Sequence, residues 1–137
     1  MRHEIIPNLR YADAPRAIEF LCAAFGFERQ AVYPDDKDPH IIHHAQLTWN
    51  DRMVMISSAY DTDHARVAKM KTAAEAGGST VGLYLIVEDV DAHAARARAA
   101  GAEIFLGPDD KDYGGRGYSA RDPEGNVWSF GSYDPWA

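Results

Sequence analysis

The sequence predicts an α+β fold of two tandem βαβββ modules, which form a curved mixed sheet around a central cavity. The chain repeats itself, because Asp13, an apolar helix pattern and Gly26 return as Asp89, an Ala-rich helix pattern and Gly101. The hairpin-like run at residues 50–55 also returns, at residues 124–129. A period of this length indicates a duplicated supersecondary module, and two modules with apolar sheet faces bury those faces by joining.

The 137 residues fit a single domain. We assign module one to about residues 1–60, a connector to about residues 61–79, and module two to about residues 80–137. The formal net charge is −7. We therefore expect no nucleic-acid partner, because such a surface needs a basic patch. The charge allows attraction of a cationic ligand, although solubility is its more common role.

Cys22 is the only cysteine, so an intrachain disulfide is impossible. It lies within a helix pattern, which favours a buried structural thiol over a nucleophile. The sequence shows no signal peptide and no apolar run long enough to span a membrane. We therefore expect a cytoplasmic protein with no membrane partner.

In module one, residues 4–10 resemble a short strand. Asp13 is a good N-cap, Pro15 is tolerated in the first helical turn, and Gly26 is placed to end the helix. Residues 28–33 indicate a second strand, followed by a polar loop at 34–39. Two further strands, at 41–49 and 52–57, form a hairpin with Asn50 and Asp51 at its turn.

Module two repeats this order. A strand at residues 82–87 precedes a helix capped by Asp89, and strands follow near 102–106, 115–121 and 126–133. The segment 122–125 makes the last turn. In the connector, the spacing of Val67, Met70 and Ala74 allows a short helix, and residues 77–79 form its flexible end.

This layout resembles the vicinal oxygen chelate superfamily, which includes glyoxalase I, extradiol dioxygenases and the bleomycin-resistance proteins. The matching segments are residues 9–13, 17–20, 25–27, 87–92 and 99–103. The most specific piece is Arg121-Asp122-Pro123-Glu124-Gly125-Asn126, and residues 128–136 resemble the end of the glyoxalase/bleomycin-resistance-like branch. The resemblance covers nearly the whole chain apart from the connector. It implies the fold and a homodimer, but not one activity, because the superfamily carries unrelated chemistries on one scaffold.

The metal enzymes of this superfamily carry a His on the first strand of a module and a Glu on its last strand. The corresponding positions here are Ile6, Met55, Gly82 and Ser129. None offers an imidazole or a carboxylate, which divalent metals in such sites require. A shift of one residue brings no better donors, since it would place Ile5, Val81 and Phe130 there. We therefore expect no metal and no cofactor.

The histidines do not replace these ligands. Adjacent residues on a strand point to opposite faces, so His43 and His44 do not share one ion. His40 and His44 have the same parity but would lie ~13 Å apart on an extended chain. We therefore expect His44 to be a single polar group in the cavity and the only candidate acid or base.

The hairpin turn determines which side chains share a face. A two-residue turn places His44 opposite Ser57, Gln46 opposite Met55, and Thr48 opposite Met53. The other face carries only apolar residues, so we expect it to pack on the helices. These residues are Ala45, Leu47, Val54 and Ile56.

The same reasoning in module two pairs Tyr118 with Ser129 and Ala120 with Val127, and directs Trp128 and Phe130 to the core. On the first strands, Asn8 shares a face with Ile6, and Tyr84 with Gly82. The predicted ligand-binding residues therefore come from both modules. They are Asn8, His44, Gln46, Met55, Ser57, Tyr84, Arg116, Tyr118 and Ser129.

Each of these residues also has a structural alternative. Tyr84 and Tyr118 either fill the barrel or stack on a ligand, and Met55 packs more often than it binds. Arg116, in the glycine-rich segment 114–118, is either a ligand contact or a surface charge. The neighbouring acidic residues, Asp109, Asp110 and Asp112, are expected to form a solvated loop.

Two functions follow from these observations. The first is a metal-free small-molecule binder of the bleomycin-resistance type, which holds an aromatic or cationic compound in the cavity. The second is a glyoxalase-like lyase, isomerase or dioxygenase, which uses unfamiliar ligands or metal-free acid/base chemistry through His44. No serine has the Gly-x-Ser-x-Gly context of a nucleophile.

Overall fold

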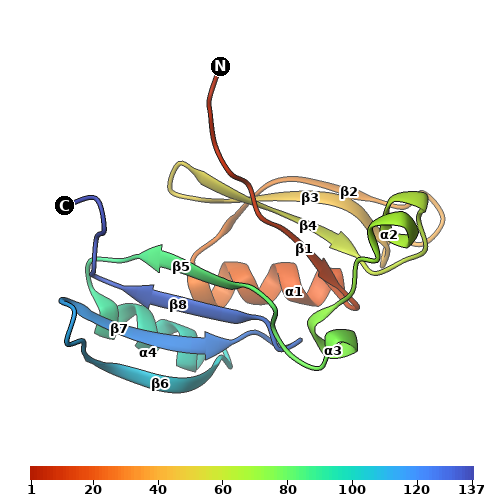
Figure 1. The fold of residues 1–137 in the computed structure, drawn as a ribbon. Coiled ribbons are helices and arrows are strands. Elements are labelled where there is room, and N and C mark those ends of the chain that lie inside the picture. Colours follow the sequence, from red (N-terminus) through yellow and green to blue (C-terminus); the bar gives the residue numbers. More distant parts are fainter.

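The computed structural model describes residues 1–137 (Figure 1). Module one contains β1 (Asn8–Tyr11), α1 (Ala14–Phe20), a π-helical turn η1 (Leu21–Phe25), β2 (Glu28–Pro34), β3 (Ile42–Trp49) and β4 (Arg52–Ser58). The connector forms α2 (Asp63–Ala68) and α3 (Ala73–Ala76). Module two contains β5 (Gly82–Ile86), α4 (Val90–Ala99), β6 (Glu103–Asp110), β7 (Arg116–Arg121) and β8 (Val127–Gly131).

Each module has its own four-stranded mixed sheet. The strand orders are β1-β4-β3-β2 and β5-β8-β7-β6, in which β1 and β5 are parallel to their neighbours and the other pairs are antiparallel. The predicted α+β class and the two βαβββ modules are confirmed. No helix is both long and apolar enough to cross a membrane.

The predicted caps of the two long helices are confirmed. The carboxylate of Asp13 accepts a hydrogen bond from the Arg16 amide at 3.2 Å, and that of Asp89 accepts one from the Ala92 amide at 3.0 Å. Pro15 lies in the first turn of α1. Gly26 ends the helical segment with φ +89°, in the left-handed region that glycine adopts readily.

Two strand boundaries differ from the predictions by more than two residues. β1 begins at Asn8 rather than at residue 4, and Pro7 contributes only its carbonyl, which accepts from the Met55 amide at 2.8 Å. A proline has no amide hydrogen to extend the ladder further. β6 runs to Asp110, four residues beyond the predicted end, with shifts in register on both sides of Leu106. The connector contains two short helices where we expected one.

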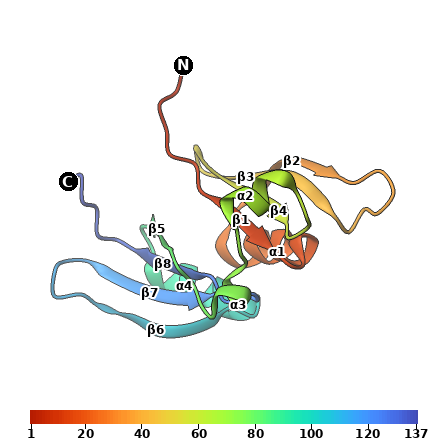
Figure 2. The ribbon, with the colours of Figure 1, turned by 45° about the vertical axis from the view of Figure 1, so that its right-hand side comes forward.

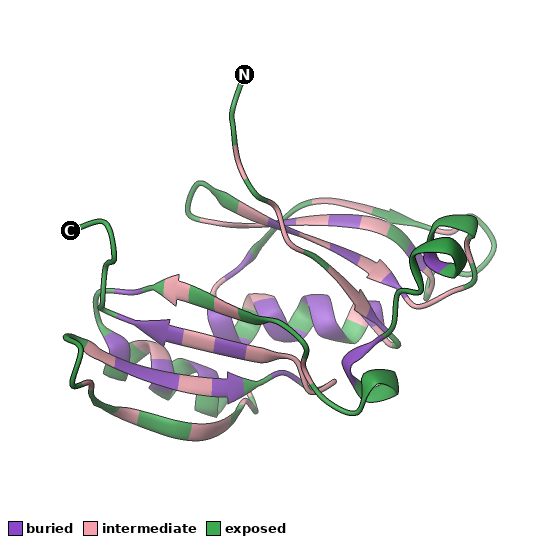
Figure 3. Ribbon diagram, viewed as in Figure 1, coloured by how far each residue is buried: buried purple, intermediate pink, exposed green.

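The helices and the inner sheet faces share one hydrophobic core. Helix α1 packs on β1, β3 and β4, while α4 packs on β6, β7 and η1 (Figures 1 and 2). The predicted helix-side residues of the first hairpin, Ala45, Leu47, Val54 and Ile56, are all buried in it, as are Trp128 and Phe130. Buried and partly exposed residues alternate along β3, β4, β7 and β8 (Figure 3). Each sheet therefore has a core face and an open face.

Candidate ligand-binding faces

The two modules are joined on the core side of their sheets. Phe25, at the end of η1, lies 4.7 Å from Phe130 and 5.5 Å from Trp128 between ring centroids. The Arg96 guanidinium of α4 donates to the backbone carbonyls of Cys22 and Ala23. Cys22 is half-buried there, and burial raises the pKa of its thiol, as expected for a structural cysteine.

The predicted turn at residues 122–125 completes this joint. The Asp122 carboxylate is buried and accepts from the Tyr11 hydroxyl at 2.6 Å and from the Trp128 indole at 3.1 Å. The Glu124 carboxylate accepts from the amides of Ala12 and Asp13, at the start of α1. We define these contacts, with those of Phe25, as the module joint. The most specific part of the family motif therefore connects the two modules.

The open face of module one carries a series of polar side chains that are hydrogen-bonded to one another. The Gln46 side-chain oxygen accepts from His44 Nε2 at 2.9 Å, and the Gln46 amide nitrogen donates to Gln30 of β2. Tyr33 stacks on His44 with ring centroids 6.1 Å apart. The predicted register of this hairpin is confirmed, since Gln46 pairs with Met55 and Thr48 with Met53. Sequence reasoning missed Gln30 and Tyr33, because irregular pairing between β2 and β3 obscures their parity.

At the connector end of this face, three of the predicted residues, Asn8, His44 and Ser57, line a hollow of about 180 Å³. The neighbouring His43 is part of a second series of hydrogen-bonded side chains, which sequence reasoning also missed. Its Nε2 donates to Asp35 at 2.9 Å, and its Nδ1 accepts from the Tyr60 hydroxyl at 2.6 Å. Hydrogen bonds from the Asp38 and Lys37 amides, and then from His43, lower the pKa of Asp35. The His–carboxylate pair thus forms at His43, and not at the predicted acid/base His44.

The predicted register of module two is wrong by one residue. Ser129 pairs with Ser119, while Tyr118 pairs with Phe130 and Ala120 with Trp128. The turn has five residues rather than four, because the Asn126 amide also donates to the Asp122 carboxylate. A one-residue slip reverses the faces of a strand, so β7 presents Ser119 to the open face in place of Tyr118.

Tyr118 lies in the core rather than on the open face as predicted, although it also contributes to the floor of the module-two hollow described below. Its hydroxyl donates to Nδ1 of His93 at 2.6 Å, and Nε2 of His93 donates to the Phe25 carbonyl at 3.0 Å. Burial raises the pKa of the Tyr118 phenol and lowers the pKa of His93. This pair therefore belongs to the module joint.

Tyr84 and Ser129 lie on the open face of module two, as predicted. The Tyr84 hydroxyl donates to the Tyr133 carbonyl at 2.7 Å, and the hydroxyls of Ser119 and Ser129 are 2.7 Å apart. A hollow of about 250 Å³ on this side of the sheet is lined by these residues together with Leu106, Lys111, Tyr113, Arg116 and Tyr133. The face thus combines exposed aromatic rings with hydroxyl groups.

Arg116 is held at the rim of this hollow by acidic partners. Its guanidinium makes two hydrogen bonds to Asp91, at 2.9 and 3.1 Å, and one to Asp110 at 3.2 Å. These contacts raise the pKa of Arg116. A guanidinium with two carboxylate partners has less capacity for a ligand than a free one. Asp110 and Asp109 lie at the end of β6 and are not simply solvated, since Asp109 pairs with Lys111.

Within one chain the predicted residues do not line a single cavity. Asn8, His44 and Ser57 line the module-one hollow, whereas Tyr84, Arg116 and Ser129 line the module-two hollow. The core faces of the two sheets meet at the module joint, so the open faces lie on its outside (Figures 1 and 2).

The residues at the family metal positions do not fit a metal. In module one Met55 pairs with Asn8, and in module two Ser129 pairs with Tyr84, so a thioether lies beside an amide in one sheet and a hydroxyl beside a phenol in the other. No group of three His, Cys, Asp or Glu side chains is arranged to hold an ion. These donors lack the imidazole and carboxylate groups of a divalent site.

The chain is similar to several known proteins. It is 35% identical over 125 residues to an uncharacterized protein of Mycobacterium bovis, which covers 91% of this chain and 80% of that protein. The crystal structure of TioX from Micromonospora sp. ML1 is 30% identical, with a TM-score of 0.72 and coverage of 95% of this chain and 98% of that one.

More distant structures share the fold. TnmS3, described as an antibiotic binding protein from Streptomyces sp. CB03234, is 21% identical, with a TM-score of 0.68 and coverage of 96% and 95%. The fosfomycin resistance protein FosX of Listeria monocytogenes, solved with Mn(II), is 13% identical, with a TM-score of 0.70 and coverage of 99% and 97%. Residues 5–130 match the model of the Glyoxalase/Bleomycin resistance protein/Dioxygenase superfamily, and the chain therefore belongs to that family.

Proposed function

We propose that the protein is a metal-free small-molecule binder of the bleomycin-resistance type, which holds an aromatic or cationic compound. The observation that carries this proposal is the composition of the open faces. The positions that hold metal ligands in the metal enzymes carry Ile6, Met55, Gly82 and Ser129, while aromatic and amide groups surround them. Stacking rings and a few fixed polar groups are typical of binding pockets.

The ligand class follows from the chemistry of the two faces. On module one, Tyr33 stacked on His44 and the adjacent Met55 offer flat and polarisable surfaces. On module two, the exposed rings of Tyr84 and Tyr113 offer faces to a planar or cationic group. The net charge of −7 favours a cation at long range.

A second copy of the chain completes the cavity in this proposal. The outer edges of β1 and β5 are unpaired, and module two leaves several apolar side chains exposed. Such edges and patches favour self-association in a symmetric dimer. The exposed residues are Val81, Tyr84, Ile86, Leu106, Tyr113 and Tyr133. The open face of module one in one chain then meets that of module two in its partner, as the predicted homodimer requires.

Native mass spectrometry of the protein purified from cells tests this function. We expect a dimer of twice the 15.2 kDa chain, with an added organic mass and without a stoichiometric metal. Elemental analysis of the same sample checks for Zn, Ni, Mn and Fe. About one metal per chain, lost on substitution of Ser129 or Met55, contradicts the metal-free proposal. A monomer across micromolar concentrations contradicts the dimer.

The hydrogen-bonded side chains of Asp35, His43 and Tyr60 favour a second candidate function, which is metal-free acid/base catalysis at the module-one hollow. Asp35 fixes Nε2 of His43 as the protonated nitrogen, so Nδ1 is free to take a proton from the Tyr60 hydroxyl. Asp35→Asn and Tyr60→Phe should then abolish turnover of a bound compound while preserving its affinity. Recovery of that compound unchanged after long incubation with the protein favours the binder.

A further inference from the structure

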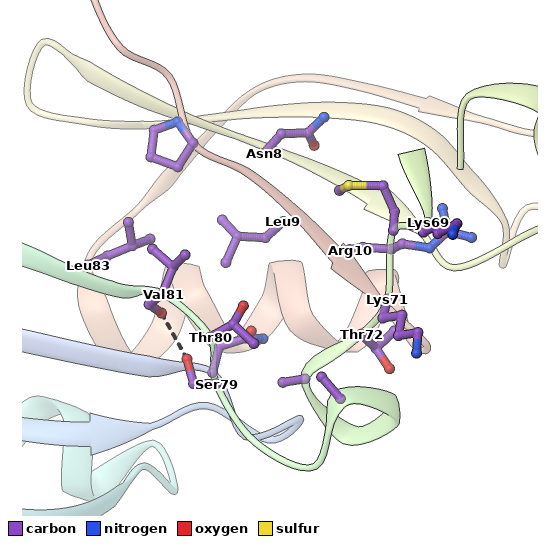
Figure 4. A pocket seen from close by; sticks show the side chains of 15 residues that line it. Asn8, Leu9, Arg10, Lys69, Lys71, Thr72, Ser79, Thr80, Val81 and Leu83 are labelled. Atoms are coloured by element: carbon purple, nitrogen blue, oxygen red, sulfur yellow. Dashed lines mark hydrogen bonds between the residues drawn. The ribbon is translucent and has the colours of Figure 1, made fainter. Parts of the chain in front are cut away.

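A separate crevice of about 510 Å³ lies between β1, the connector and the start of β5 (Figure 4). It is larger than either hollow on the open faces. Its volume falls within the ~300–1,000 Å³ that is usual for small-molecule sites. It is lined by 15 residues, from Pro7 to Arg10, from Lys69 to Ala73, and at Ala76, Ser79, Thr80, Val81, Leu83 and Asn126.

The charge of this crevice is opposite to that of the whole chain. Arg10, Lys69 and Lys71 line it, and no Asp or Glu is among its lining residues, although the chain has 21 acidic residues and a net charge of −7. Two of the four lysines of the chain are thus gathered here. None of the three cations forms an ion pair within 4.0 Å. The nearby Glu75 carboxylate accepts hydrogen bonds from Thr72.

Two features distinguish the charged end of the crevice. One terminal nitrogen of Arg10 donates to the Tyr60 carbonyl at 2.6 Å, while its Nε is buried and makes no hydrogen bond. A buried donor without a partner is costly, and the guanidinium keeps further terminal N–H groups that make no hydrogen bond in the structure and remain open to an anion. Lys69 ends α2 with φ +55°, in the left-handed region that a lysine rarely adopts.

The opposite end of the crevice is apolar. Leu9, Val81 and Leu83 lie across from the cations, with the hydroxyl of Thr80 between the two ends (Figure 4). Val81 is 68% exposed, which leaves apolar surface open to a ligand. The crevice therefore offers one end to charge and the other to hydrocarbon.

We propose that this crevice binds a small organic anion, a carboxylate or a phosphate monoester that carries an apolar group. The anionic head lies between Arg10, Lys69 and Lys71, and the apolar group lies against Leu9, Val81 and Leu83. Arg10 supplies a fixed donor, and the lysines supply mobile charges. This site differs from the one in the proposed function in its lysines and its apolar end, although Asn8, Arg10 and Met70 line both the crevice and the module-one hollow.

Titration of the ¹⁵N-labelled protein with hexyl phosphate and hexanoate tests the proposal, with hexanol and inorganic phosphate as probes that lack one half of the ligand. We expect saturable amide shifts at residues 69–73 and 79–83. The better anion should bind at least about tenfold more tightly than hexanol, because charge-assisted hydrogen bonds are lost with the neutral head. The stronger of the two anions identifies the head group. Equal affinity for hexanol, or shifts confined to the open faces, overturns the proposal.

A matched pair of variants separates specific contacts from net charge. The double variant Lys69→Gln with Lys71→Gln should weaken binding by about tenfold. The control, Arg16→Gln with Lys37→Gln, removes the same charge at exposed positions outside the crevice and should leave affinity unchanged. Equal weakening by both contradicts the site. A Tyr84→Ala variant should retain anion binding, so failure here is distinguishable from failure of the proposed binder function.

Discussion

The module joint and the open faces use similar residue types in opposite ways. At the joint, Asp122 is buried and both of its oxygens accept hydrogen bonds, from partners in both modules. On the open faces, Tyr84 is 44% exposed, and its hydroxyl bonds only to a nearby carbonyl. A fully satisfied buried network fixes one arrangement of the chain, whereas half-exposed aromatic and amide groups keep capacity for a ligand.

This difference separates the parts of the family motif that maintain the fold from those that vary with function. The segment 121–126 joins the modules, whatever the protein binds. The open faces carry Met55 and Ser129, two of the positions that the resemblance aligns with metal ligands, and neither side chain is an imidazole or a carboxylate. Residues of the module joint that match the family motif therefore identify the family, whereas the side chains on the open faces indicate which ligand or reaction the protein serves.

The largest effect is expected at the joint. Asp122→Ala leaves the Tyr11 hydroxyl and the Trp128 indole buried without an acceptor. We expect a loss of about 3–5 kcal/mol in the free energy of unfolding, as for other broken buried networks. Urea denaturation followed by tryptophan fluorescence measures it. Asp36→Ala, at an exposed position whose carboxylate makes no hydrogen bond or ion pair, should change stability by less than about 0.5 kcal/mol. Similar losses of stability in both variants would show that the Asp122 network contributes no more than an exposed carboxylate does.

A smaller effect, on affinity rather than stability, is expected on the open face. Tyr84→Ala should weaken binding of an aromatic ligand roughly five- to tenfold, because stacking contributes on the order of 1 kcal/mol. Titration calorimetry measures the affinity, and the midpoint of urea unfolding should stay close to that of the parent chain. Tyr118→Ala provides the contrast, since this buried residue should lower stability instead. Unchanged affinity in Tyr84→Ala places the binding surface elsewhere.

The smallest effect concerns pH. Burial lowers the pKa of His93 below 6.5, so the unfolded chain binds this proton more readily than the folded chain does. Stability from this group is therefore fully present above pH 6.5 and is lost as the pH falls below it. Urea midpoints between pH 7.5 and 5.5 should decrease, and His93→Gln should reduce the slope. A slope that is unchanged in His93→Gln assigns the dependence to other groups.

The sequence predicted the fold, both helix caps and the faces of the first hairpin, because a two-residue turn leaves only one register. It did not predict the face of Tyr118, since the Asp122 carboxylate recruits Asn126 into a longer turn. It also missed the long-range pairing of Tyr11 with Asp122, and the bonds from Arg116 to Asp91. Contacts between residues distant in sequence leave no periodic signal.

The central claim is that two chains together build the ligand cavity from opposite open faces. Subunit complementation tests it most directly, with ethidium as a planar cationic fluorescent probe. One variant carries His44→Ala and Gln46→Ala, and the other carries Tyr84→Ala and Ser129→Ala. Each alone should bind poorly. After the two are unfolded and refolded together, half of the dimers are mixed, and each mixed dimer contains one intact cavity. The account therefore predicts recovery of about a quarter of the parent sites. No recovery, with mixed dimers demonstrated by native mass spectrometry, would contradict a cavity shared between chains.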